Sequence, residues 1–521
     1  MLATGCRVLY VDLDKQRIRI THRDDLREKE LGGAGVAAKL LMENVRAELP
    51  PLDPAQPMVL AHGVGTFVYP MLTQTVAMFR SPIHGGLAES RAGGRLAMCL
   101  FMAGYDAVVI TGRSSKPLYL TLQQDDVSFK DARILWGASQ DDAGQIIRER
   151  EPQSGKRSIL RIGPAGEKKV PLASVRVDTY QSFDQGFGAL MGSKRLKAIT
   201  VLAGDQPKAI QNLPVYFDVF RGIHRTCMDR RSAAMREDPL AEQHLVRRLS
   251  CTGCPVGCIR IGQFRRTFDE GRQYETVQVA YDKRRLWAMG DLLGMGADAA
   301  LPLLEAADHA GVDAVAAGIA LRWATCALAQ GRLAAADTLE PLAFGEGYER
   351  AIEHLAHRRN TFYALLGRGA HEAARVYGDE GLLCTSSGLA IHLPSDYRGL
   401  GEAVFGLPIQ ENYGLAEGVC AASLAGCLSL CSEMPSVYER RTVVNALNAI
   451  NIPVNGEDLA LLAERVTSQK LALQQKLGQR PGELPENFWQ NPLAKALDEK
   501  TWLEEQRKLS QKLRTLREIS A

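Results

Sequence analysis

The chain contains 521 residues, of which 46% are hydrophobic and 24% are charged, and its formal net charge is +3. These values are typical of globular proteins, and so small a net charge argues against a nucleic-acid partner. No stretch of about 18 apolar residues occurs, so we expect no membrane span. Eleven cysteines, an odd number, and a start without a signal-peptide pattern indicate a reducing compartment, and we expect the cytoplasm.

The first part of the sequence, residues 1–205, is predicted to be a β-rich domain. Short runs rich in β-branched residues and separated by glycines predict strands at 7–12, 17–21, 58–61, 75–79, 107–111, 118–122, 158–162 and 198–202. Helical spacing of apolar residues predicts helices at 35–48 and 139–151, and Ser139 is expected to cap the second one.

From residue 206 onwards the pattern becomes helical. Amphipathic segments predict helices at 297–309, 314–330, 348–357, 370–377 and 458–477, and a charged, solvated helix closes the chain. At the usual domain size of about 100 to 200 residues, we expect two to four domains. We therefore predict an α+β fold, with a β-rich domain at 1–205 and mainly helical domains at 206–400 and 401–521.

Three closely spaced cysteines are the strongest chemical signal in the sequence. Cys251, Cys254 and Cys258 are three and four positions apart, so their thiolates can converge on one centre. With a fourth, distant sulfur they could hold an iron-sulfur cluster. A zinc site would normally show a second Cys or Cys/His pair nearby, and none follows within about fifty residues. Three structural thiols are the ordinary alternative. Downstream candidates for the fourth sulfur are Cys326, Cys384, Cys420, Cys427 and Cys431.

Glycine-rich segments in the first domain are a second signal. Residues 79–86 lead into 89–94 and 103–110, a pattern typical of a strand, a loop, a helix and a second strand. The paired glycines Gly93 and Gly94 could bring backbone amides against an anionic group. A purely structural glycine turn explains the same residues.

These segments, together with residues 31–35, 162–167 and 191–199 and the cysteine motif, have the order and approximate spacing of the aldehyde ferredoxin oxidoreductase family. The chain resembles this family over nearly its whole length. The resemblance implies a β domain that forms the base for a tungsten or molybdenum bis-pyranopterin, two helical domains that cap it, and a 4Fe-4S cluster beside one pterin. It also implies aldehyde or carboxylate chemistry, with electrons passed to ferredoxin or an iron-sulfur subunit; a homo-oligomer stays open.

The resemblance also gives roles to individual residues. Cys431 would complete the cluster, with Cys427 as the competing ligand, and Glu275 would be the catalytic proton carrier in a closed apolar site. The residues expected to hold the pterin and its phosphates are Arg80, Arg91, Gly93, Gly94, Lys194, Asp308, Gly311, Val312, Asp313 and Leu430. From the residues alone, Gly311 would end one helix and Asp313 would cap the next.

Several positions depart from the family pattern at the expected pterin site. Gln74, Tyr180 and Asp184 stand where arginines are expected. Arg91 replaces an asparagine, and Gly426 and Ser429 replace an aspartate and a glycine before Cys431. An expected catalytic histidine has no counterpart in position, and His392 is the nearest in kind.

Three functions follow from this pattern. The first is a tungsten or molybdenum oxidoreductase. The second is a relative that has lost the pterin and works as a 4Fe-4S electron-transfer or assembly subunit. The third and weakest is a zinc-stabilised binding protein. If Tyr180, Phe183 and Phe187 fill the pterin cleft, no cofactor can enter it.

Overall fold

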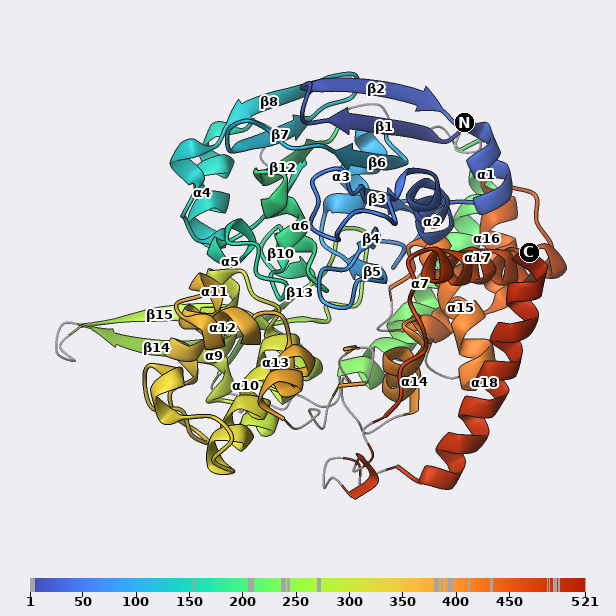
Figure 1. Cartoon of the computed structure of the whole chain (residues 1–521). Coiled ribbons are helices and arrows are strands. Elements are labelled where there is room, and N and C mark those ends of the chain that lie inside the picture. The colour runs from blue at the N-terminus through green and yellow to red at the C-terminus, as the bar shows by residue number, and fades with distance from the viewer. Residues whose placement is uncertain are drawn as a thin grey trace.

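The computed structural model describes residues 5–152, 155–204, 210–235, 240, 244–268, 273–378, 384–385, 388–389, 391, 397–410, 413–431, 434–484, 486, 488–490, 494 and 497–520. A β-rich part formed by the N-terminal 200 or so residues lies across the top of Figure 1, and two groups of helices lie beneath it. The predicted α+β fold class, with a β-rich region followed by helical ones, is confirmed.

The first six-stranded sheet carries the loop with the paired glycines. Its strands lie in the order β2 (Arg17–His22), β1 (Arg7–Asp12), β6 (Ala107–Thr111), β3 (Met58–His62), β4 (Thr75–Arg80) and β5 (Leu87–Ala92). β1 and β6 pair in parallel, and the other described pairs are antiparallel. β5 ends the sheet, and the chain leaves it directly into Gly93 and Gly94.

A second six-stranded sheet packs against the first. Its strands lie in the order β11 (Gln181–Phe183), β10 (Val175–Val177), β9 (Arg157–Arg161), β12 (Leu196–Leu202), β7 (Leu118–Leu122) and β8 (Val127–Asp131). Apolar residues of both sheets, of α3 (Leu96–Ala103) and of α6 (Phe187–Ser193) form one buried cluster. Their burial removes apolar surface from water and holds the two sheets together.

Helices cover the outer faces of the two sheets. α1 (Asp24–Glu30) and α2 (Gly33–Asn44) cover the first sheet, and α2 also contacts C-terminal helices. α4 (Gln140–Arg150) covers the second sheet, while η1 (Arg133–Leu135) and α5 (Pro164–Glu167) flank it. Ser139 caps α4 as predicted, because its Oγ accepts a hydrogen bond from the Asp142 N–H at 3.0 Å.

The second part begins with a small sheet and continues as helices. The sheet consists of β13 (Leu245–Leu249), β14 (Ile259–Phe268) and β15 (Gln273–Tyr281), and the β14–β15 hairpin projects to the left in Figure 1. The helices that follow are α8 (Lys283–Met289), η2 (Asp291–Leu293), α9 (Ala300–Ala310), α10 (Ala314–Ala329), η3 (Ala335–Thr338), α11 (Tyr348–His357), α12 (Thr361–Leu366) and α13 (Ala370–Tyr377). They share one apolar cluster. The hairpin was not among the predicted strands.

The third group of helices lies on the right in Figure 1. It contains α7 (Leu213–Met235), α14 (Tyr397–Phe405), α15 (Leu415–Leu428), η4 (Pro435–Val437), α16 (Arg440–Ala449), α17 (Gly456–Lys476), η5 (Phe488–Gln490) and α18 (Glu499–Ser520). α7 packs on α16, so this helix of the predicted 206–400 domain lies with the C-terminal helices. The predicted domain limits otherwise stay a prediction.

The closing helix differs from its prediction. α18 was expected to be solvated, but Leu509, Leu513 and Leu516 are buried against the neighbouring helices. One apolar face therefore docks it on α15 and α17. No helix in the described part of the chain is long and apolar enough to cross a membrane.

Candidate functional site

The cysteine loop between β13 and β14 rests on the glycine pair that follows β5. The Gly94 N–H donates a hydrogen bond to Cys251 Sγ at 3.2 Å, and the Thr252 N–H donates one to the Gly94 carbonyl at 3.1 Å. A Cβ added to Gly93 would lie 2.6 Å from Cys251 Sγ. Glycine is therefore needed at this position for the thiol to approach the backbone so closely.

The segment 71–74 joins this loop to the chain around Cys431. The Cys431 N–H donates to the Met71 carbonyl at 3.1 Å, and Leu430 and Leu72 form an isolated β-bridge. The Thr73 hydroxyl lies within hydrogen-bonding reach of the Cys251 thiol. The fourth predicted ligand and the first one are thus attached to neighbouring residues of a single segment.

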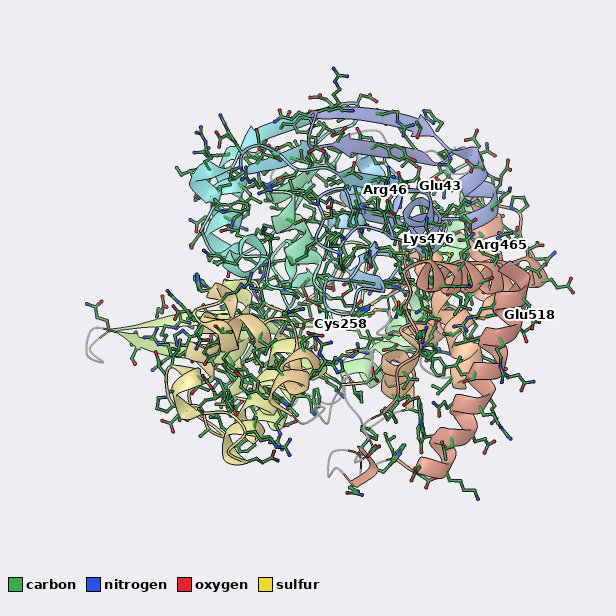
Figure 2. All side chains as sticks on the ribbon, viewed as in Figure 1. Glu43, Arg46, Cys258, Arg465, Lys476 and Glu518 are labelled. Atoms are coloured by element: carbon green, nitrogen blue, oxygen red, sulfur yellow. The ribbon has the colours of Figure 1, made fainter. Side chains whose placement is uncertain are left out.

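Cys254, Cys258 and Cys431 belong to the same apolar cluster, which also contains Cys227 of α7. Figure 2 labels Cys258, which lies where the β-rich part meets the two helical groups. Burial raises the pKa of the Cys251 and Cys254 thiols, while N–H groups near each sulfur act in the opposite direction. A bound metal would remove these protons, because a coordinating cysteine is a thiolate.

Cys227 is a neighbour of this cluster that the sequence did not indicate. Its Sγ lies 3.5 Å from the Met71 sulfur, and burial together with the nearby Cys254 raises its pKa to about 11. It stands on α7, 24 positions before Cys251, and no motif spacing connects the two.

Of the other candidate sulfurs, Cys427 lies in the same apolar cluster as Cys431, and the remaining three lie elsewhere. Cys427 is fully buried on α15, and the charged groups near its thiol belong to Lys470, Glu30 and Glu89. Cys326 and Cys384 lie with the second group of helices, and Cys420 packs in the cluster around α18. The backbone contact of Cys431 with Met71 is the observation that sets it apart from Cys427, and the choice of Cys431 as the fourth ligand stays a prediction.

No three His, Cys, Asp or Glu side chains of the described residues are placed to hold a metal ion. In a 4Fe-4S cluster each cysteine binds a different iron, so the four thiolates do not have to reach one ion. Close packing of Gly93 on Cys251, with amide and hydroxyl donors on the sulfur, fits such a cluster. Ligation by all four cysteines stays a prediction.

Two of the predicted phosphate-binding cations serve the protein itself. Arg80 donates to the carbonyl oxygens of Gly85 at 2.7 Å and Ala47 at 3.0 Å. Lys194 is fully buried and donates to the carbonyl oxygens of Pro54 and Gln56. Burial lowers the pKa of Lys194 to about 7. Neither side chain is directed at an external anion.

Arg91 forms a buried ion pair at the end of the first sheet. Its Nη2 lies 2.5 Å from Glu89 Oε1 and 2.9 Å from the Ala422 carbonyl, and Lys470 Nζ lies 2.6 Å from Glu89 Oε2. Burial alone would raise the pKa of Glu89, but Lys470 and Arg91 lower it to about 2. The three charges are therefore satisfied by one another.

Asp308 is held by two arginines from different parts of the fold. Arg285 of α8 approaches Oδ1 at 2.5 Å, and Arg176 of β10 pairs with Oδ2. Burial raises the pKa of this carboxyl, but the two guanidinium groups outweigh burial and lower it. Asp308 is thus an ionised, internally paired carboxylate.

Gly311, Val312 and Asp313 connect α9 to α10. Gly311 ends α9 with φ 77°, and Val312 bridges to Ala173. The Asp313 carboxylate accepts from the N–H groups of Val315 and Ala316 at 2.9 and 3.0 Å. The helix-end interpretation of these residues is therefore observed directly. Burial and the neighbouring Asp313 raise the pKa of Asp184.

Ser429 occupies the position of the family's glycine. Its φ is 61°, a conformation that favours glycine, and its Oγ accepts a hydrogen bond from the Gly63 N–H. That bond offsets part of the backbone cost, and the segment before Leu430 and Cys431 keeps its turn.

Glu275 does not lie in a closed apolar site, which its predicted catalytic role requires. It stands on β15 in the projecting hairpin, its side chain is 53% exposed, and it pairs with Arg266 at 3.2 Å. The exposed end of the hairpin leaves this carboxylate in contact with solvent. This position does not support the catalytic role of Glu275, which stays a prediction.

The three aromatic residues that would exclude a cofactor by filling the cleft have partners of their own. Phe187 packs on Phe79 with ring centroids 4.8 Å apart and on Phe183 at 5.5 Å, inside the core between the sheets. Tyr180 and Cys251 both pack against a small apolar cluster of β14 and β15 residues, and the Tyr180 hydroxyl lies 3.2 Å from Arg247 Nη2. His392 lies outside the described residues.

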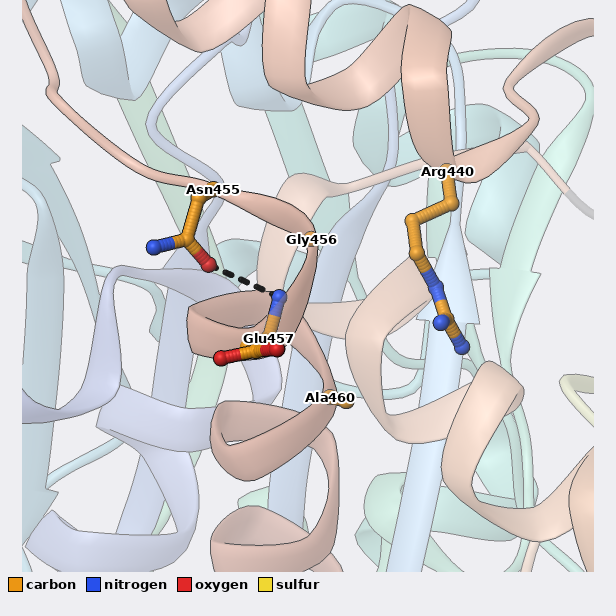
Figure 3. A pocket seen from close by; sticks show the side chains of 5 residues that line it. All are labelled: Arg440, Asn455, Gly456, Glu457 and Ala460. Carbon is orange, nitrogen blue, oxygen red and sulfur yellow. Dashed lines mark hydrogen bonds between the residues drawn. The ribbon is translucent and has the colours of Figure 1, made fainter.

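A separate pocket of about 570 Å³ opens at the start of α17 (Figure 3). Its lining residues are Arg440, Asn455, Gly456, Glu457 and Ala460. The Asn455 side-chain oxygen accepts from the Glu457 N–H at 2.8 Å, so this group caps α17. The pocket contains none of the predicted site residues.

Comparison with known proteins agrees with the resemblance in the sequence. The family model described as aldehyde ferredoxin oxidoreductase, N-terminal domain, matches residues 8–203, and the model for domains 2 and 3 matches residues 220–404. Cys431 lies beyond both matched ranges.

Two curated relatives come from Pyrococcus furiosus. A tungsten-containing aldehyde ferredoxin oxidoreductase is 28% identical over 430 residues, which cover 73% of this chain and 68% of the relative. The WOR-like subunit of an aliphatic sulfonate oxidoreductase is 25% identical over 434 residues, which cover 72% and 67%.

The fold is also similar to a solved structure, an active site complex BamBC of benzoyl coenzyme A reductase with 1,5-dienoyl-CoA. The TM-score is 0.78 and the sequence identity 20%, and the likeness covers 98% of this chain and 94% of the other. At this identity the likeness concerns the fold alone.

Proposed function

Because this chain belongs to the aldehyde ferredoxin oxidoreductase family and is an oxidoreductase, we propose that it works as a cluster-bearing electron-transfer chain. Cys251, Cys254, Cys258 and Cys431 would hold a 4Fe-4S cluster. The observation that carries the proposal is the attachment of Cys251 and Cys431 to the same segment, 71–74. When bound, such a cluster supplies one-electron transfer.

The surrounding residues would position the sulfurs and adjust their charge. The Gly94 N–H and the Thr73 hydroxyl face Cys251, and hydrogen bonds to a cluster sulfur favour the reduced, more negative state. The apolar cluster around Cys254 and Cys431 excludes water from the other side. Electrons would pass to ferredoxin or, more in keeping with the subunit names of relatives, to an iron-sulfur partner subunit.

A second candidate is a complete tungsten or molybdenum enzyme that acts on an aldehyde or a carboxylate. The names of the tungsten-containing relatives favour it. It requires free cations for the pterin phosphates and free carboxylates for the pterin edge. The described residues at those positions are already paired within the protein, so the residues do not fit this cofactor.

Two serine variants test the ligand assignment. Anaerobically purified wild-type chain should contain about four iron atoms, and Cys431→Ser should lose most of the iron because one ligand is missing. Cys427→Ser is the matched control, since Cys427 is a buried thiol four positions away. Iron loss in Cys427→Ser with full iron in Cys431→Ser would refute the assignment, and one zinc in place of iron would refute the cluster.

A further inference from the structure

We propose that side chains of this chain itself fill the positions at which the family places its metal-pterin, so that the chain binds no pterin. This absence of a pterin deepens the proposed function, from which it takes only the presence of the cluster. It comes from two separate ion-pair networks, one around Asp308 and one around Glu89.

The chemical groups of a metal-pterin decide which residues a binding site for it needs. The pterin ring has an amino-pyrimidinone edge with neighbouring N–H donors, arranged as in a guanidine. A carboxylate can accept hydrogen bonds from these donors. The phosphates of the cofactor carry clustered negative charge, which must meet free cations when it leaves water. A site for this group therefore needs carboxylate oxygens and cations that have no other partner.

At Asp308 the N–H donors come from two arginines of the protein itself. Arg285 faces Oδ1 at 2.5 Å and Arg176 pairs with Oδ2, so a guanidinium stands at each carboxylate oxygen. The same two arginines also donate to the carbonyls of Ala280 and Thr179 at 2.9 and 3.0 Å, which fixes both in place. These two guanidinium groups therefore occupy the carboxylate oxygens that would otherwise accept from the pterin edge.

Near Glu89, two departures from the family pattern are linked, because one side chain fills the space that the other position leaves. Gly426 stands where the family has an aspartate, and a Cβ added there would lie 2.7 Å from Arg91 Nη2. Arg91, in place of an asparagine, therefore fills the space that the aspartate side chain would need. Glu89 accepts from Arg91, and Lys470 neutralises the remaining oxygen.

The other residues at the predicted phosphate positions offer no free cation to an anion. Arg80 and Lys194 donate to backbone carbonyls. Asp184 stands where an arginine is expected, and its side chain accepts a hydrogen bond from the Ser182 hydroxyl at 3.2 Å, so it supplies no positive charge for a phosphate. The network around Asp308 also links β10 of the first part to α8 and α9 of the second, a connection that needs no cofactor.

Metal and pterin analysis of the full chain tests the inference. The chain is produced in cells that assemble metal-pterin cofactors and are supplied with tungstate and molybdate, beside the tungsten-containing Pyrococcus furiosus relative as a loading control. We expect iron but neither tungsten, molybdenum nor fluorescent oxidised pterin. Tungsten or molybdenum with pterin near one equivalent per chain overturns the inference. Absent iron with absent pterin overturns the proposed cluster and leaves the inference standing.

Two arginine variants test the network itself. Arg285→Gln should lower Tm by roughly 3–5 °C, because it leaves a buried carboxylate short of a partner. Arg266→Gln, at a 43% exposed guanidinium that pairs with Glu275 and Glu305, should change Tm by about 1 °C or less. Equal Tm values for the two variants would contradict the inference. Should Arg285→Gln fail to fold, the metal and pterin content of the wild-type chain decides.

Discussion

At the scale of single residues, equal side chains have unequal roles because their surroundings differ. Glu89 and Glu275 both pair with an arginine, but the Glu89 side chain is 3% exposed and that of Glu275 is 53% exposed. A buried carboxylate without its charge leaves Arg91 and Lys470 unpaired, whereas water replaces the partner of an exposed one. Burial, which cannot be read from the sequence, decides which of the two glutamates contributes to stability.

Glu89→Gln should therefore destabilise the chain by about 3–5 kcal/mol at pH 7. Glu275→Gln should cost about 1 kcal/mol or less. Because the folded pKa of Glu89 is about 2 against 4.5 in the unfolded chain, its stabilisation is complete above pH 4.5 and is lost as the pH falls towards 2. Thermal melts of both variants and of the wild type at a series of pH values check this. A wild-type advantage over Glu89→Gln that does not narrow below pH 4.5 would contradict the account.

At the scale of elements, the end of β5 and the cysteine loop form one unit. The close approach of Gly93 to Cys251 Sγ leaves no space for a side chain, so Gly93→Ala should displace the loop and lose most of the bound iron. Gly222→Ala is the control, because no atom lies within 4 Å of an added Cβ on this helical glycine. It should keep its iron and gain about 0.5–1 kcal/mol in stability. Iron analysis and melting curves of the two variants decide, and full iron in Gly93→Ala would show that the contact is not needed.

Elements with regular patterns could be predicted, and those that depend on distant partners could not. Strands such as 107–111 and the capped helix after Ser139 carry their signals locally. The β14–β15 hairpin alternates apolar and polar residues at its base, as in 259–261 and 277–279, but not at its exposed end around Arg265 and Arg266, so the alternating signal is short. α18 looked solvated because its apolar face is narrow among many charges.

At the scale of the whole molecule, the family likeness indicated where the site lies but not how its charges are satisfied. The cysteine spacing and the glycine pair pointed to the region where the three parts meet. The partners of Arg91 and Asp308 come from positions far apart in sequence, Lys470 and Arg176 among them. Such pairs have no local signature, although Glu89 and Arg91 stand two apart on one strand face.

The most direct test of the central claim is the iron and acid-labile sulfide content of the anaerobically purified full chain. We predict about four of each per chain, held at the meeting point of the cysteine loop and the segment that ends at Cys431. Zinc near one equivalent without iron or sulfide, or a chain free of metal after anaerobic purification, would contradict the claim.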